Sequence, residues 1–444
     1  MRSILLILLF DLPLCSSDLN FLISIGRNGA IREKRDYSME VAFDRVSNFG
    51  DLTDIGTRSM YELGKAFRKE YSSFVPASFG EKVHQIFSAP LNSLISSSYA
   101  FLFGLYGPGT GGFPETEDPI HSMPPVSEIK TKIYHKSTLP KQLGLAAVHS
   151  SDSDTDYFFG KGCPSLQSRL INARNTLLMR YNSTFEPLYT LLEDNGMDPE
   201  FLYKQNHFSA VTAFDSCEYI ISRAHSYGDI VEYKSALIVQ CEKLVALASI
   251  GPFEDVSLRK AYLHSVAKML NDKVGKAGAI PLKFISLFGE AEFLGAFLAL
   301  FTPTNSACIV NNYLKISSEK SIKEHVGISD ECISYIPFSS ILVLEVRGRS
   351  ELCVKAKYNN WSIKLMGKEC YPFSDFILEI LPQENTENFS ESCGSEFLKT
   401  AEVSLGLIVG LIASMILFLV LLVLLLKTKI ELGSLKREYS RIKK

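Results

Sequence analysis

Short apolar runs alternate along this chain with longer stretches that have a helical period. Three short runs, at residues 21–25, 83–88 and 282–288, predict strands, and the first is apolar on both faces, as a buried strand is. Two more, at 341–346 and 352–357, flank a short polar turn and predict a β-hairpin. The pattern therefore predicts an α/β fold with a central sheet.

The stretches between these strands predict helices, above all at residues 164–192 and 230–270. A chain of 444 residues is longer than one compact core usually requires, so we expect a two-part globular region. We place an α/β core at about 18–110 and 275–385, with an α-helical part at about 160–274 inserted between its halves.

Hydrophobic segments at both ends predict a membrane-anchored protein. Residues 1–17 have a basic start, a short apolar core and small residues, the order of a secretory signal peptide. Residues 403–426 carry no charge and are long enough to cross a membrane as a helix. The basic tail, 427–444, is then cytosolic, and residues 18–402 are a lumenal or extracellular ectodomain of a single-pass, type I membrane protein.

Charge and cysteine content narrow the function. A formal net charge of −3 argues against a nucleic-acid partner. Removal of Cys15 with the signal peptide would leave eight of the nine cysteines, an even number that predicts disulfides in an oxidising lumen, with free buried thiols as the alternative. The eight lack C-x-x-C spacing, so we expect no zinc site, and no motif calls for another metal or cofactor. The ectodomain contains three N-glycosylation sequons, at Asn182, Asn360 and Asn388.

Two features near the carboxyl end predict partners. Gly406, Gly410 and Ser414 recur every four residues in the predicted membrane helix, where small residues allow two helices to form a homodimer; the alternative is a monomeric anchor. The tail segment from Tyr439 to Ile442 has the Tyr-x-x-apolar form of a sorting signal read by adaptor proteins. The alternative is that its basic residues bind anionic lipid.

The first strand leads into Arg27-Asn28-Gly29-Ala30-Ile31-Arg32. This segment resembles the R-H-G-x-R-x-P motif of the histidine acid phosphatase family, in which the His attacks phosphorus and the two Arg hold phosphate oxygens. Arg27 and Gly29 match the motif. Asn28 occupies the place of the nucleophile, Ile31 that of the second Arg, and Arg32 lies one residue late.

Later segments strengthen the resemblance. The stretch 52–71, with L-T-x-x-G, Y-E-L-G and a basic end, is similar to the same stretch in prostatic and lysosomal acid phosphatases. Where the family has R-S-T-D-x-D-R, Phe87 falls at the first Arg and Ser93 at the last. Where it has S-A-H-D, Gly289 falls at the His and Glu290 at the acid that protonates the leaving group.

The resemblance implies a doubly wound mixed sheet of the histidine phosphatase type with an inserted helical domain. It also implies a degenerate active site, because an Asn amide cannot form the phosphohistidine intermediate. We therefore predict a catalytically inactive or strongly impaired pseudo-phosphatase that serves as a lumenal binding protein. In its emptied site we expect Arg27 to pair with Glu290. The alternatives are an active acid phosphatase hydrolysing phosphate monoesters with unusual groups, and a structural surface or vesicle glycoprotein.

The resemblance has implications for disulfides and destination as well. It implies that Cys217 pairs with Cys332, and that Cys163 bridges to Cys370 or Cys393. Because lysosomal members carry a tyrosine signal in a short tail, it implies endosomal or lysosome-like vesicles, with the cell surface as the alternative.

Overall fold

A computed structural model describes residues 19–32, 50–111, 144–194, 203–204, 207–208, 210–226, 235–274, 281–300, 306–316, 333, 336–348, 351–380, 393 and 433. The described residues up to 380 belong to one compact unit, and residues 387–444 to a second. The predicted signal peptide, membrane helix and sorting signal lie outside the described residues, as does Asn388. None of the described helices is long and apolar enough to cross a membrane.

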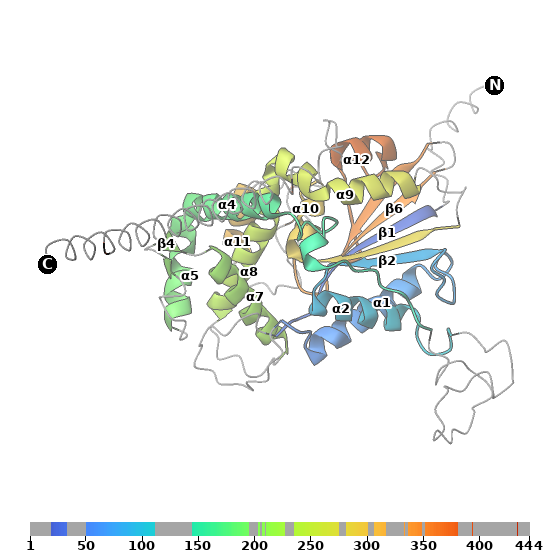
Figure 1. The fold of residues 1–444 in the computed structure, drawn as a ribbon, viewed down its shortest axis with the longest axis horizontal. Helices are drawn as coiled ribbons and strands as arrows, with labels where there is room; N and C mark the ends of the chain where they lie inside the picture. Colours follow the sequence, from blue (N-terminus) through green and yellow to red (C-terminus); the bar gives the residue numbers. More distant parts are fainter. Residues whose placement is uncertain are drawn as a thin grey trace, which may run out of the picture. The chain divides into compact units, whose positions relative to one another are not determined.

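A mixed sheet of seven strands forms the centre of the first unit (Figure 1). In sheet order the strands are β2 (His84–Ser88), β5 (Phe284–Gly289), β1 (Leu19–Arg27), β6 (Ile341–Arg347), β7 (Cys353–Tyr358) and β8 (Trp361–Ile363), with β9 (Tyr371–Pro372) paired to β7. Strands β2, β5 and β1 run parallel, whereas β6 is antiparallel to β1. A separate pair joins β3 (Tyr203–Lys204) to β4 (His207–Phe208).

Burial explains why the apolar runs became strands. Phe21, Leu22, Ile23 and Ile25 of β1 have no exposed surface, since β1 lies between β5 and β6 in the interior of the sheet. The predicted strands at 21–25, 83–88 and 282–288 are confirmed, and so is the hairpin, formed by β6 and β7.

Helices cover both faces of the sheet (Figure 1). On one face α1 and α2 lie against each other, and Gly64 and Gly104 make the close approach possible, because a Cβ on either would lie 2.0 Å from a backbone oxygen of the other helix. The bounds on this face are α1 (Asp54–Glu70) and α2 (Asn92–Leu105), and those on the other are α9 (Val256–Val274), α10 (Ala291–Leu298) and α12 (Phe373–Ile380).

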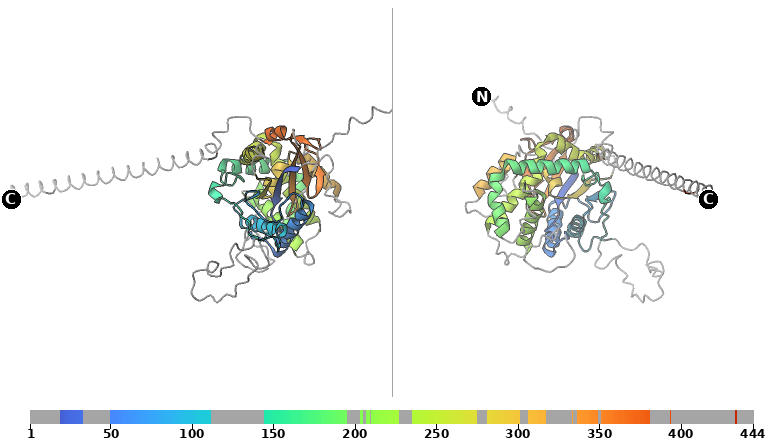
Figure 2. Two further views of the ribbon diagram at one scale, coloured as in Figure 1. Left: turned by 90° about the vertical axis from the view of Figure 1, so that its right-hand side faces the viewer. Right: turned by 60° about the vertical axis from the view of Figure 1, so that its left-hand side comes forward.

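The remaining helices gather beside the sheet (Figure 2). They are α4 (Pro164–Arg180), α5 (Asn182–Asp194), α7 (Ala210–Ser226), α8 (Ser235–Ile250) and α11 (Ser306–Ile316). The helical pattern predicted over 164–192 divides at Tyr181 into α4 and α5. The pattern over 230–270 divides into α8 and α9 at a 3-10 turn, Gly251–Glu254, because Pro252 has no N–H to continue an α-helix.

Candidate functional site

The parallel strands β1, β5 and β2 end at one edge of the sheet, where α/β folds form their ligand crevice. Arg27, at the end of β1, is in register with Gly289 at the end of β5. A cavity of about 400 Å³ opens beside these ends. Its lining combines carboxylate, amide, hydroxyl and apolar groups, from Asn28, Ile31, Gly50, Pro90, Leu91, Asn92, Ser93, Glu218 and Glu290.

Arg27 is 2% exposed, and both terminal nitrogens of its guanidinium have partners. Nη2 forms an ion pair with Glu218 Oε1 at 2.5 Å, and Nη1 donates to the carbonyl oxygen of Ile336. The guanidinium carbon also lies 4.1 Å from the centre of the Phe338 ring, a cation–π distance. The predicted pairing of Arg27 with Glu290 is therefore wrong. The carboxylate that neutralises Arg27 comes from α7, in the helical part of the unit.

Helix α7 holds the segment after β1 at a second point. The hydroxyl of Ser222 donates to the carbonyl oxygen of Ile31 at 2.6 Å. Because Glu218 and Ser222 are four residues apart, they lie on one face of α7 and reach both ends of the Arg27–Ile31 segment. The sequence contained no signal for this, since 191 residues separate each helix residue from its partner.

Asn28 occupies the predicted nucleophile position, lines the cavity and is 5% exposed. Its side-chain Nδ2 donates to the carbonyl oxygen of Gly29 at 2.9 Å. Its backbone carbonyl oxygen accepts from the Ser339 N–H at 2.9 Å. The amide nitrogen lone pair is delocalised into the carbonyl, so this side chain hydrogen-bonds but is no nucleophile. Asn28 therefore closes the wall of the cavity and braces the loop.

Gly29 keeps the family glycine because the loop lies directly on α1. A Cβ at Gly29 would lie 2.5 Å from the backbone oxygen of Gly56, inside contact distance. The Gly29 N–H donates to Ser97 Oγ at 3.1 Å, so α2 also fixes the loop. Helix α1 begins at Asp54 because Thr53 caps it: the Thr53 hydroxyl accepts from the Gly56 N–H at 2.9 Å.

Gly289 and Glu290, at the end of β5, stand where the family has its His and acid. A Cβ at Gly289 would lie 2.5 Å from the Phe293 ring, so the space for a larger side chain is already filled. Glu290 lines the cavity and forms an ion pair with Lys161, from the segment before α4. It thus sits where the alignment predicted an acid, but with a cationic partner that the sequence did not reveal.

The remaining predicted positions divide between cavity and surface. Ser93 lines the cavity and is 6% exposed, and its carbonyl oxygen accepts from Ser97 Oγ. Phe87 lies outside the lining, with its ring 5.4 Å from that of His149 and 5.5 Å from that of Phe158. Arg32 is exposed and also outside the lining, so it does not replace the missing clamp. Within the described residues, then, the cavity wall contains no imidazole, thiol or cationic side chain.

His84, the histidine nearest to the motifs, has a structural role in the core. It is fully buried on β2, with Nδ1 2.9 Å from the Tyr106 hydroxyl and Nε2 2.9 Å from Ser286 Oγ. Ser24 on β1 extends this network by donating to Ser286 Oγ at 2.9 Å. Burial lowers the pKa of His84 to about 3, so the imidazole is neutral at ordinary pH. No group of three or more metal-ligating side chains occurs among the described residues.

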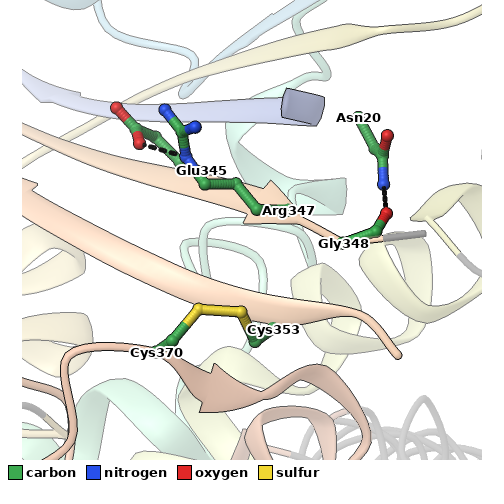
Figure 3. The surroundings of a disulfide bond; sticks show 6 residues. All are labelled: Asn20, Glu345, Arg347, Gly348, Cys353 and Cys370. Carbon is green, nitrogen blue, oxygen red and sulfur yellow. Dashed lines mark hydrogen bonds and ion pairs between the residues drawn. A yellow bond between two sulfur atoms is a disulfide. The ribbon is translucent and has the colours of Figure 1, made fainter. Parts of the chain in front are cut away.

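The disulfides correct the predicted partner of Cys217 and one of the two predicted partners of Cys163. Cys217 pairs with Cys241, not Cys332, because α7 and α8 lie side by side and bring these two Cα atoms within 4.8 Å. Cys370 pairs with Cys353, not Cys163, and this bond ties the start of β7 to the segment before β9 (Figure 3). Cys163, Cys308 and Cys393 are also disulfide-bonded, whereas Cys332 lies outside the described residues.

Comparisons with known proteins agree with this architecture. Residues 18–227 match the model of the histidine phosphatase superfamily (branch 2). Testicular acid phosphatase of Mus musculus is 28% identical over 162 residues, which is 35% of this chain and 37% of that protein. Lysosomal acid phosphatase of Xenopus laevis is 29% identical over 110 residues, 24% of this chain and 26% of that protein. The matched segments thus span little more than a third of these relatives at most.

Solved structures extend the likeness to most of the chain. A phytase of Klebsiella sp. ASR1 superposes with a TM-score of 0.51 at 13% identity, covering 82% of this chain and 95% of its own. A phytase of Citrobacter braakii gives a TM-score of 0.51 at 11% identity, covering 82% and 97%. At such low identity these similarities concern the fold alone.

Proposed function

This chain belongs to the histidine acid phosphatase-like family, and from that premise we propose that it is a non-catalytic member, a membrane-anchored lumenal glycoprotein that retains the fold as a binding platform. The family chemistry transfers phosphate to a histidine nitrogen and then to water, with cationic donors for the developing charge and an acid for the leaving alkoxide. The first two of these requirements meet an obstacle at the cavity.

The nucleophile is the first obstacle. Asn28 stands in its place, and no described histidine lines the cavity. Removal of a nucleophile costs about 10⁶ in rate in well-studied enzymes. Gly289, at the second family histidine, has its side-chain space filled by Phe293, so even a substituted histidine would not fit there without rearrangement.

The buried Arg27–Glu218 pair is the observation that carries the proposal. Arg27 is the one family clamp position that keeps its cation in register, and its Nη2 already holds a carboxylate oxygen at 2.5 Å. A phosphate would have to displace Glu218 from Arg27, and breaking a buried ion pair costs several kcal/mol. Glu218 therefore acts as a built-in anion in the place that substrate phosphate would need.

The cavity is better suited to a neutral, hydrogen-bonding ligand. Its two carboxylates, Glu218 and Glu290, each have a cationic partner, Arg27 and Lys161. Amide and hydroxyl groups of Asn92, Asn28 and Ser93 add donors and acceptors, while Pro90, Leu91 and Ile31 add apolar contact. A cavity of about 400 Å³ lies within the size range of small-molecule sites.

Sequence features and relatives support the proposed location. The signal-peptide-like order of residues 1–17 and the uncharged apolar segment 403–426 support a lumenal ectodomain in the secretory pathway. The testicular and lysosomal acid phosphatases that resemble this chain suggest the secretory pathway or lysosome. We propose that Tyr439 and Ile442 direct the protein to endosomal or lysosome-like vesicles through an adaptor, and that Gly406, Gly410 and Ser414 mediate a homodimer in the membrane.

Hydrolysis of para-nitrophenyl phosphate by the purified full chain in detergent, between pH 4 and pH 7, tests the loss of catalysis. We expect no release of para-nitrophenol above the rate in buffer alone. The matched control is Arg27→Lys, which keeps a cation beside Glu218 but removes the planar donor fork. A measurable rate that falls at least about tenfold in Arg27→Lys would come from this cavity and would contradict the proposal.

A further inference from the structure

The tip of the β7–β8 hairpin presents one of the three sequons. Tyr358 pairs with Trp361, and the two residues between them, Asn359 and Asn360, have φ of +46° and +71°. This is the two-residue turn with both central residues left-handed that Asn favours. Asn359 turns inward, its Oδ1 accepting from Ile341 N–H at 2.9 Å, whereas Asn360 is exposed. The turn thus commits one asparagine to the fold and presents the other to solvent.

The residue that follows is unusual for a surface. Trp361 is the only tryptophan of the chain, and it is 60% exposed. It begins β8, the last strand on the path of the sheet in the described part of the chain, where one edge of β8 has no strand beside it. Soluble proteins cover or interrupt such edges, because an unpaired edge beside an apolar side chain invites pairing with another chain. A cover for Trp361 and β8 is therefore expected.

We propose that Asn360 carries an N-linked glycan whose first sugar lies against Trp361 and covers the edge of β8. The inference rests on the lumenal placement proposed above. The transfer uses a lipid diphosphate-linked oligosaccharide as co-reactant: Asn360 Nδ2 forms a bond to the anomeric carbon, the bond from that carbon to the diphosphate oxygen breaks, and the amide nitrogen gives its proton to a base. Ser362, also exposed, supplies the hydroxyl of the sequon.

The covalent link makes the contact favourable. A sugar ring has an apolar face of C–H groups, and an indole offers a broad apolar surface with little conformational entropy to lose. Because the glycan is attached to the residue next to Trp361, the contact forms within one molecule at high effective concentration.

Asn182 provides a matched comparison within the same unit. It is also an exposed sequon asparagine, but it begins α5, and its Oδ1 accepts from the Tyr189 hydroxyl at 3.4 Å. The sole tryptophan, Trp361, lies within the Asn360 sequon, so tryptophan fluorescence reports on the glycan at Asn360 alone. Loss of the glycan at Asn182 should therefore leave the tryptophan signal unchanged.

To test this, the full chain is expressed in cells with a secretory pathway. Glycopeptide mapping then shows whether Asn360 carries a glycan. Acrylamide quenching of tryptophan fluorescence, after the glycans are trimmed to the first sugar, measures how far that sugar shields Trp361. We expect a glycan on Asn360. We also expect quenching in Asn360→Gln to be roughly twofold stronger than in the wild type, because the sugar shields about half of the exposed indole. Ser362→Ala, which removes the sequon but keeps the turn asparagine, should match Asn360→Gln, and Asn182→Gln should match the wild type.

Two results would overturn the inference: an unmodified Asn360 in protein that is glycosylated at Asn182 or Asn388, and equal quenching in the wild type, Asn360→Gln and Ser362→Ala. If none of the three sequons carries a glycan, the lumenal placement itself fails, and the inference fails with it.

Discussion

Arg27 and Glu345 lie on the neighbouring strands β1 and β6, and each is a charged residue that is 2% exposed, but they are held in different ways. Arg27 has its carboxylate partner, Glu218, on a helix 191 residues away. Glu345 receives three donors: Tyr71 at 2.8 Å, Lys357 at 3.0 Å and Arg347 at 2.8 Å, the last visible in Figure 3.

The number of partners around Arg27 and around Glu345 reflects the role of each charged side chain. Glu345 is anchored by neighbours within the sheet and by Tyr71, the residue after α1, so the loss of one contact leaves others in place. Arg27 lies at the end of β1 that borders the crevice. In a catalytic family member the donors of this arginine would be open to substrate, whereas in this chain the Glu218 carboxylate neutralises it. The charge at the site therefore depends on a single pair, whereas the charge in the scaffold is shared.

Removing one member of the single pair should have the largest effect. We expect Glu218→Ala to lower the free energy of unfolding by about 3–5 kcal/mol, because it leaves the Arg27 guanidinium buried without its counter-ion. Urea denaturation of the full chain with intact disulfides measures this value. The double variant Arg27→Met with Glu218→Leu removes both charges and should lie within about 1 kcal/mol of the wild type. A loss below about 1 kcal/mol in Glu218→Ala would mean that water, not Glu218, neutralises Arg27.

The same contrast explains how far the sequence could predict the molecule. Strand β1 followed from a run that is apolar on both faces, as a buried strand is, and β2 and β5 followed from short β-favouring runs. The position of the cavity followed from the motif at the end of β1, and Asn28, Ile31, Ser93 and Glu290 do meet there. These features are encoded locally.

Glu218 and the disulfide partners could not be predicted in this way. Glu218 follows Cys217 on an amphipathic helix, and nothing in that spacing indicates that the helix faces the end of β1. Cys217 pairs with Cys241 because α7 lies against α8, a contact between helices that a helical period cannot specify. The resemblance to the family also implied the wrong partner for Cys217, namely Cys332. Contacts between distant segments decide both cases.

His84 provides an intermediate case, a buried group that is polar but neutral. Burial lowers its pKa to about 3, whereas an unfolded histidine has a pKa near 6.5. The folded state therefore binds fewer protons between these values, so stability is complete above about pH 6.5 and is lost as the pH falls. We expect the loss between pH 7 and pH 5 to include about 2 kcal/mol from His84.

Urea denaturation of His84→Gln at both pH values should show that much less pH dependence than the wild type. His149→Gln is the control, since the His149 side chain is 43% exposed and its ion pair with Glu81 lies at the surface, where such a pair contributes little. Equal pH dependence in His84→Gln and the wild type would contradict the assignment of the neutral imidazole to the core.

Glu345→Gln should have the smallest effect, about 1 kcal/mol at pH 7, because Lys357 keeps its ion pair with Glu70 and the amide still accepts hydrogen bonds. Burial by itself would raise the pKa of Glu345, but hydrogen bonds from Lys357, Tyr71 and Arg347 outweigh it and lower the pKa. The contribution of Glu345 is thus present above the unfolded pKa, near 4.3, and is lost as the pH falls through the lower folded pKa.

Unfolding curves between pH 5 and pH 3 should therefore show the wild type losing stability more steeply than Glu345→Gln, with exposed Glu351→Gln following the wild type. If Glu345→Gln instead lost as much stability as Glu218→Ala, Glu345 would depend on one dominant contact. Its three donors would then not share the charge, and the distinction between a scaffold charge and a site charge would disappear.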